Sequence, residues 1–193
     1  QSYVWYRKGG AIMYGLQDLI GEERLNTAFK KYIDSAAFRP TAPFTTTNEW
    51  YSFMQEVTPD SLKYYLEDSF EKITLYSNKV ENAFYKELKN GSYEVTLEIE
   101  SIKSYYDGNG NLLEEPETPN YLDIAVFSED STNEQGMITK TPIIIEKKWI
   151  TPGKSTLTYV VNEKPIKAGI DPYNKMIDRI PADNLVNLEE ADE

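Results

Sequence analysis

Residues 93–99 read Tyr-Glu-Val-Thr-Leu-Glu-Ile, and this stretch decides the fold. Its apolar side chains, at Tyr93, Val95, Leu97 and Ile99, alternate with charged or hydroxyl-bearing ones. Successive side chains of a strand point to opposite faces, so this alternation predicts a strand with one buried face and one solvent-facing face. A helix would instead repeat its apolar positions every three or four residues.

Downstream of this strand, the sequence continues in strand-sized pieces. Apolar runs predict further strands at residues 121–127, 142–150 and 155–161. Residues that accept positive φ or interrupt regular structure stand between the strands: Asn90-Gly91, Asp107-Gly108-Asn109-Gly110 and Pro152-Gly153. Residues 83–163 are therefore predicted to form a small antiparallel β-sandwich.

Upstream, the apolar positions follow a helical period. Residues 3–20 and 22–38 are predicted as helices separated by Gly21, and the second carries a stripe of Leu25, Ala28, Phe29, Tyr32, Ile33 and Ala36. A third helix is predicted after Thr46, because Glu49 lies three residues on in a capping-box pattern. A fourth is predicted with Thr58 as its cap and Pro59 in the first helical position.

The resulting prediction is an α+β fold, with a helical segment over residues 1–82 followed by the β-sandwich over residues 83–163. The remaining residues, 164–193, follow neither period and contain Pro165, Gly169, Pro172 and Pro181. Because the chain also ends in a run of acidic residues, this part is predicted to be an irregular acidic tail.

Charge and composition exclude several functions. The net charge of −12 repels phosphate, so nucleic acid is not an expected partner. The chain has no histidine and no cysteine, which excludes Ser-His-Asp and Cys-His catalysis and a zinc site built from those ligands. No apolar run approaches the roughly 20 residues needed to span a bilayer, so this piece is predicted to be soluble.

Two short motifs have a plain structural explanation. The sequence that begins at Asp107 imitates a calcium loop, but Leu112 stands where glycine is required and Thr118 where glutamate is required. A simple hairpin turn is the preferred interpretation. Residues 90–92 fit the Asn-x-Ser glycosylation pattern, and the Asn-Gly pair is already explained by a turn.

A more specific pattern lies near the start of the chain. Tyr6-Arg7-Lys8-Gly9-Gly10 opens the first predicted helix, and Leu19-Ile20-Gly21-Glu22-Glu23 joins it to the second. This pattern resembles the zinc aminopeptidases of the aminopeptidase N and leukotriene hydrolase family, in which a Tyr-x-Lys-Gly segment starts a helix downstream of the zinc motif. The order Thr46, Trp50, Phe53 and the segment 57–61 are similar to that family's helical continuation. Residues 168–179 are similar to the tail of a bacterial subgroup.

The resemblance implies that the chain is a C-terminal fragment of a bacterial metallopeptidase, a hydrolase that removes N-terminal residues from peptides. It implies that Tyr6 is the catalytic residue of this piece, as the hydrogen-bond donor to the oxyanion of the transition state. Lys8 is expected to be supporting rather than catalytic. The family's His-Glu-x-x-His helix and downstream Glu ligand have no counterpart here, so zinc would belong to the parent protein. The isolated chain is expected to bind no metal or cofactor and to be inactive.

Several alternatives stay open at this point. Tyr6 can instead be a packing residue of the first helix, and Tyr3 competes for its role but lacks the Lys-Gly spacing. The whole chain can instead be a non-catalytic binding or scaffolding module with a peptidase-derived fold.

The beginning of the chain also bears on its partners. Gln1 runs directly into a predicted helix, so position 1 is predicted to be a cut or processing boundary, with a missing upstream catalytic domain as partner. Some bacterial relatives of the tail follow membrane-embedded segments, which leaves a membrane-anchored parent open. Substrate residue preference, oligomeric state and compartment stay undetermined.

Overall fold

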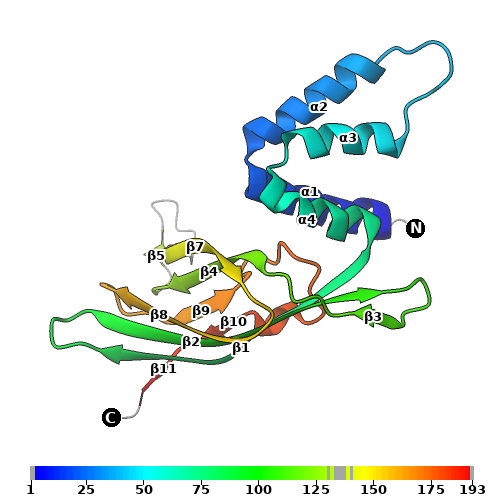
Figure 1. Cartoon of the computed structure of the whole chain (residues 1–193). Coiled ribbons are helices and arrows are strands. Elements are labelled where there is room, and N and C mark those ends of the chain that lie inside the picture. Colours follow the sequence, from blue (N-terminus) through cyan, green and yellow to red (C-terminus); the bar gives the residue numbers. More distant parts are fainter. Residues whose placement is uncertain (1–2, 130, 133–137, 140, 192–193) are drawn as a thin grey trace. The chain divides into compact units, whose positions relative to one another are not determined.

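The computed structural model describes residues 3–129, 131–132, 138–139 and 141–191, and it confirms the α+β class. Two compact units make up the chain, Gln1–Thr74 and Leu75–Glu193. Helices form the first unit and strands dominate the second (Figure 1). Among the described residues, no helix is both long and apolar enough to cross a bilayer.

The first unit is a series of short helices. A π-helical turn, Tyr3–Lys8, leads directly into α1 (Gly9–Ile20), and α2 (Glu22–Ala36), α3 (Thr47–Val57) and α4 (Lys63–Leu66) follow. A 3-10 turn, Asp60–Leu62, precedes α4, and a second π-helical turn, Glu67–Glu71, comes after it. The most deeply buried apolar side chains of these helices are Leu16, Ala28, Met54 and Leu66.

Hydrogen bonds and dihedral angles test the predicted helix boundaries. Gly21 separates α1 from α2 with a φ of 88°, which a residue without a Cβ adopts easily. Thr46 is the N-cap of α3, as predicted, because its Oγ1 accepts a hydrogen bond from the Glu49 backbone N–H at 3.3 Å. The prediction that Thr58 caps a fourth helix is wrong. Its hydroxyl donates to the Met54 carbonyl at 2.7 Å and so ends α3 instead.

The apolar stripe of α2 is only partly buried. Leu25 and Ala28 are buried, whereas Phe29 is half-buried and Ile33 is 56% exposed. Towards its C-terminal half, α2 contacts α3 through Tyr32, whose ring meets that of Phe53 edge-on with centroids 6.2 Å apart. The helical period therefore predicted the helix correctly but overstated how much of its face is covered.

The predicted boundary at residue 82 is wrong, because β1 (Ile73–Glu87) begins well before it. The buried positions of β1 alternate, but Asn78 stands among them and breaks the apolar pattern from which strands are predicted. Asn78 is buried, and its Oδ1 accepts a hydrogen bond from the Ser101 hydroxyl at 2.7 Å. Because Asn78 is polar, the apolar alternation of β1 is interrupted, and the sequence pattern did not predict this strand.

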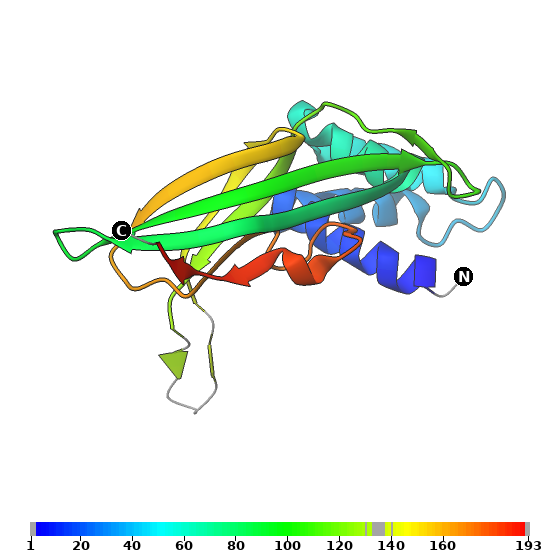
Figure 2. The same ribbon diagram turned by 90° about the horizontal axis from the view of Figure 1, so that it is seen from below.

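Two larger sheets form the second unit, and their strands are mostly antiparallel. The first sheet has the order β11-β1-β2-β3, with β8 also paired to β2; the second has the order β10-β9-β4-β7. Figure 2 shows β1, β2 and β8 side by side as long strands. The bounds are β2 (Tyr93–Tyr106), β3 (Leu112–Glu114), β4 (Asn120–Phe127), β7 (Pro142–Ile150) and β8 (Gly153–Val161). Of the short pair β5 (Ser131–Thr132) and β6 (Ile138–Thr139), only these residues are described.

The strand that decided the prediction lies at the centre of the first sheet. Val95, Leu97 and Ile99 are at most 1% exposed, as the alternation at residues 93–99 predicts. β2 pairs antiparallel with β8 from Tyr93 opposite Val161 to Ser101 opposite Gly153. In the second sheet, β4 is buried on both faces, and Leu122, Ile124 and Val126 supply its apolar core positions.

The prediction of an irregular tail is also wrong. The segment contributes β9 (Lys167–Ile170), β10 (Leu185–Asn187) and β11 (Glu189–Glu190), of which β9 lies between β4 and β10. Gly169 is needed where it stands, because a Cβ there would lie 2.1 Å from the Asn184 carbonyl oxygen. β11 pairs with β1 in the parallel direction, whereas most strand pairs of this unit are antiparallel.

Candidate functional site

The predicted catalytic residue, Tyr6, lies in the π-helical turn that precedes α1. Its side chain is 79% exposed, so its hydroxyl is not enclosed by the surrounding helices. A neutral phenol at such a place can donate a hydrogen bond to an external oxygen. Lys8, at the end of the same turn, is half-buried.

The chain's own residues do not fit a zinc site. Histidine and cysteine are absent from the whole sequence, and no cluster of three or more potential ligands occurs among the described residues. The carboxylate of the calcium-like turn is committed to its own loop. Asp107 Oδ1 accepts from the backbone N–H groups of Asn109 at 2.8 Å and Asn111 at 2.9 Å, and its Oδ2 accepts from Asn111 Nδ2 at 2.9 Å. These hydrogen bonds lower the pKa of Asp107, and the bond from the Asn111 side chain has the largest effect.

The glycosylation-like motif is likewise built into a turn. Asn90 Oδ1 accepts from the Ser92 backbone N–H at 3.1 Å and from the Ser92 hydroxyl at 2.7 Å. Ser92 is buried, and Gly91 between them has a φ of 81°. The geometry therefore gives all three residues a structural role.

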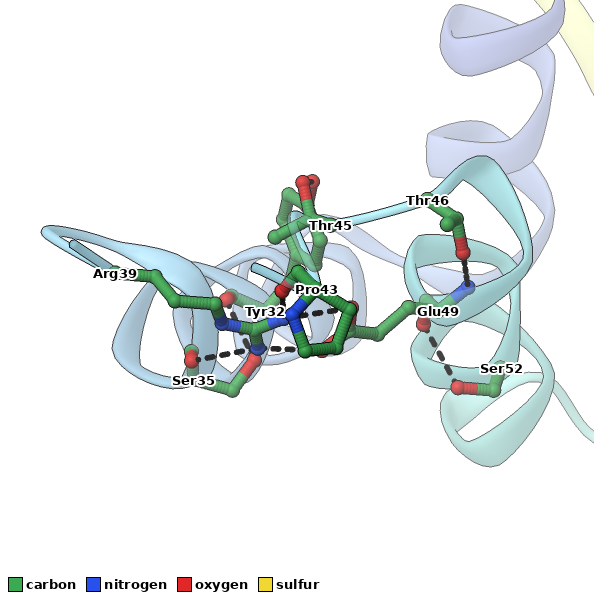
Figure 3. A network of polar contacts seen from close by, with 8 residues as sticks. All are labelled: Tyr32, Ser35, Arg39, Pro43, Thr45, Thr46, Glu49 and Ser52. Atoms are coloured by element: carbon green, nitrogen blue, oxygen red, sulfur yellow. Dashed lines mark hydrogen bonds and ion pairs between the residues drawn. The ribbon is translucent and has the colours of Figure 1, made fainter. Parts of the chain in front are cut away.

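The most organised polar cluster of the first unit was not predicted from the sequence. It joins the α2–α3 loop, which we define as residues 37–46, to the two helices that flank it (Figure 3). Arg39 Nη2 donates to Glu49 Oε1 at 2.8 Å and to the Ser35 carbonyl at 3.1 Å, while its Nη1 donates to the Pro43 carbonyl at 3.1 Å. One guanidinium thus connects the end of α2, the loop and the start of α3.

Further contacts hold the same loop. The Tyr32 hydroxyl donates to Thr45 Oγ1 at 3.0 Å, and Thr46 caps α3. The hydrogen bond from Arg39 lowers the pKa of Glu49, so the carboxylate stays ionised beside its cation. The Arg39 and Glu49 side chains are about a third exposed, at 27% and 31%.

Two aromatic side chains of the α2–α3 loop lie in solvent. Phe38 is 100% exposed and Phe44 is 68% exposed. Phe38 also has a φ of 57°, in the left-handed region that bulky side chains rarely adopt. Together these features make the loop the most unusual surface of the first unit.

The second unit contains a cluster of charged side chains in its interior. Asp123 is 5% exposed and contacts two cations, Lys147 Nζ at 2.6 Å from Oδ1 and Lys175 Nζ at 2.7 Å from Oδ2. Asp171 lies beside them, since its backbone N–H donates to the Asp123 carbonyl at 2.7 Å. The Asp171 carboxylate accepts from the backbone N–H groups of Lys175 at 2.9 Å and Met176 at 3.0 Å.

Burial is the main cause of the unusual titration of Asp171. It raises the pKa of this carboxyl to about 6, and the nearby charges of Asp123 and Asp178 act in the same direction. The two backbone hydrogen bonds oppose that shift. Asp123 lies on β4, whereas Asp171 and Lys175 lie in the segment after β9. Their contacts therefore hold this segment against β4.

A groove of about 740 Å³ separates the start of β7 from the end of β8, and Pro142, Ile144, Val160 and Glu163 are among its lining residues. The same two strands are joined by the Tyr159 hydroxyl, which donates to Glu146 Oε1 at 2.8 Å.

Comparisons with known proteins add little to this geometry. No family model matches the chain, and no curated protein matches it either. Among solved structures, it is similar to a β-glucosidase from Listeria innocua in complex with glucose, at 12% identity and a TM-score of 0.32, over 62% of this chain and 16% of that one. The same glucosidase in complex with isofagomine matches at 12% identity and a TM-score of 0.31, over 61% and 16% of the two chains. Likeness at this level carries no argument about function.

Proposed function

We propose that this chain is the helical and β-sandwich part of a zinc aminopeptidase, and that Tyr6 donates a hydrogen bond to the scissile carbonyl oxygen. One observation carries the proposal: Tyr6, within its Tyr-x-Lys-Gly motif, opens a helix and is 79% exposed. A buried tyrosine with a partner in its own helices would have favoured a packing role. The resemblance of the motif and of the following helix pair to the aminopeptidase N and leukotriene hydrolase family supplies the reaction.

The role proposed for Tyr6 is that of a hydrogen-bond donor, through its phenol O–H. During attack on a peptide bond, negative charge develops on the carbonyl oxygen, and a donor placed there stabilises the transition state more than the substrate. A phenol O–H can donate a hydrogen bond to that oxygen without bringing a charge of its own. Zinc, which would supply Lewis-acid activation, requires ligands from outside this chain.

The alternative function is a non-catalytic binding module. The exposed Phe38 and Phe44 favour it, because they offer apolar contact area at the surface and take no part in the chemistry proposed for Tyr6.

The test is the Tyr6→Phe variant of the full-length protein, assayed on an aminoacyl-p-nitroanilide. The variant removes one hydroxyl from an exposed side chain, so folding and zinc content should be unchanged. We expect kcat to fall about 100- to 1000-fold, the usual effect of losing one oxyanion donor, with a much smaller change in KM.

Tyr14→Phe is the matched control, because Tyr14 lies on α1 and is 55% exposed. It should leave kcat unchanged. Full activity of the Tyr6→Phe variant would assign Tyr6 to a structural role, and absence of peptidase activity in the zinc-loaded wild-type protein would favour the binding module.

A further inference from the structure

The α2–α3 loop exposes apolar surface in spite of two separate energetic costs. A fully exposed Phe38 leaves an aromatic ring in contact with water, and its φ of 57° adds backbone strain. Phe44, six positions further along, is 68% exposed. Figure 1 shows that this connection arches beyond the ends of α2 and α3. The rings therefore stand on a protruding, convex part of the unit.

The backbone that carries the rings is anchored. Arg39, next to Phe38, is fixed by Ser35, Pro43 and Glu49, and Pro43 in turn immediately precedes Phe44 (Figure 3). Both aromatic residues thus neighbour a residue that the guanidinium holds. A loop that is already ordered loses less conformational entropy when it binds. The contacts of Arg39 therefore favour a role of this loop in binding.

The surroundings of the rings carry no net charge, although the chain as a whole has a net charge of −12. Between residues 37 and 46 the single charged residue is Arg39, which is paired with Glu49. On α2, Asp34 is paired with Lys30 at 2.6 Å. Lys31 of α2 is paired with Glu56, which lies in the last turn of α3, away from the loop. A neutral surface of this kind suits a partner that also lacks net charge.

The polar groups of the loop are partly removed or turned inwards. Pro40 and Pro43 have no backbone N–H, and the Pro43 carbonyl is occupied by Arg39. The Thr45 and Thr46 hydroxyls accept hydrogen bonds from Tyr32 and from α3. These contacts leave fewer polar groups of the loop to face a partner.

The size and shape of the exposed patch also favour lipid over protein. Stable protein interfaces bury at least about 1,000 Å² in total, whereas an aromatic side chain buries about 150–250 Å². Two rings on a convex loop are a small interface for a protein, and they would need a matching socket. A bilayer surface accepts apolar side chains without a preformed socket.

We propose that the α2–α3 loop is a peripheral membrane contact that inserts Phe38 and Phe44 into an uncharged, phosphatidylcholine-like bilayer surface. The contact is weak and reversible, since even a single acyl chain gives only marginal binding. It does not depend on Tyr6 or on peptidase activity.

The test measures partitioning of the 193-residue chain onto phosphatidylcholine vesicles by flotation, with vesicles that contain phosphatidylserine as a comparison. In the F38S/F44S double variant, the partition coefficient should fall about tenfold per ring, or about 100-fold in all. Circular dichroism should show the same thermal midpoint for this variant and the wild type, because both rings are exposed.

The control variant is L112S/L113S, which removes two leucines of β3 that are 53% and 66% exposed. It should partition like the wild type. A second measurement uses the absence of cysteine, because a fluorophore attached to T41C, between the rings, has a unique site. Its emission should shift to the blue with phosphatidylcholine vesicles, and a label on N109C in the β2–β3 turn should not respond.

Three results would overturn the proposal. One is wild-type partitioning no stronger than that of the double variant. Another is binding that requires phosphatidylserine, since the attraction would then be electrostatic and would not come from insertion of the two rings. The third is concentration-dependent self-association that the double variant abolishes without vesicles, which would assign the loop to contact with a second copy of the chain.

Discussion

The two units use the same ionic chemistry in opposite surroundings. In the helical unit, Arg39 and Glu49 pair at the surface, where water screens the attraction. In the sheet unit, Asp123 pairs with Lys175 in the interior, where both side chains are less than a tenth exposed. The distances are nearly equal, 2.8 Å and 2.7 Å, so distance alone does not indicate what a pair contributes.

The difference lies in what remains when one partner is removed. A surface cation that loses its anion is hydrated by water, and the cost is small. A buried cation that loses its anion keeps its desolvation penalty without the attraction that offset it. The surface pair therefore places a loop, and the buried cluster holds β4 to the chain that follows β9.

The largest expected effect is that of Asp123→Ala. Lys147 and Lys175 would lose the anion they share, and unfolding in urea should show a loss of about 3–5 kcal/mol. Asp34→Ala is the surface counterpart, since it removes the anion from Lys30, whose side chain is 75% exposed. It should cost under about 0.5 kcal/mol. Equal losses in the two variants would contradict the contrast between the units.

The second prediction concerns pH and Asp171. Because the pKa of this carboxyl is raised to about 6 from an unfolded value of 3.8, the native state holds its proton between these values and the unfolded state does not. This residue's contribution to stability is therefore fully present below about pH 4 and is lost as the pH rises through 6. The free energy of unfolding should fall by about 3 kcal/mol in all, since each pKa unit between the native and unfolded values corresponds to about 1.36 kcal/mol.

Carboxylates with lowered pKa, such as Glu49 and Asp107, destabilise the fold at acid pH, so the effect of Asp171 must be isolated by difference. Asp171→Asn is suitable, because asparagine tolerates the φ of 44° at this position. Between pH 4 and 7, the free energy of unfolding of the wild type should fall relative to that of the variant. Parallel pH profiles for the two proteins would mean that Asp171 titrates normally.

Arg39→Lys is expected to act on the α2–α3 loop more than on global stability. Lysine keeps the charge but lacks the planar fork that reaches Ser35, Pro43 and Glu49 together. The free energy of unfolding should change little, because the ion pair with Glu49 is exposed to solvent screening. Chymotrypsin cleavage after Phe38 should become faster, because the loop would open without global unfolding. An unchanged cleavage rate would show that the loop is held by its other contacts.

Parts of the fold that depend on neighbours along the chain could be predicted from sequence. The alternation around Leu97 identified β2, and the Thr46 hydroxyl with Glu49 three residues on identified the start of α3. Composition alone excluded a zinc site of the usual ligands, because the chain has neither histidine nor cysteine. The motif around Tyr6 likewise singled out a residue, although its exposure became known only from the folded chain.

What the tertiary structure alone decided involves residues that are far apart in the chain. Asn78 lies at a buried strand position and is hydrogen-bonded to Ser101 of β2. Asp123 is a buried anion that forms an ion pair with Lys175, from the segment after β9. The final strands formed in a proline-rich segment because β4 and β1 offered them edges to pair with. Periodicity in the sequence indicates which side of a helix or strand is apolar. Strand pairing and burial depend on contacts with residues far away in the sequence, so only the tertiary structure determines them.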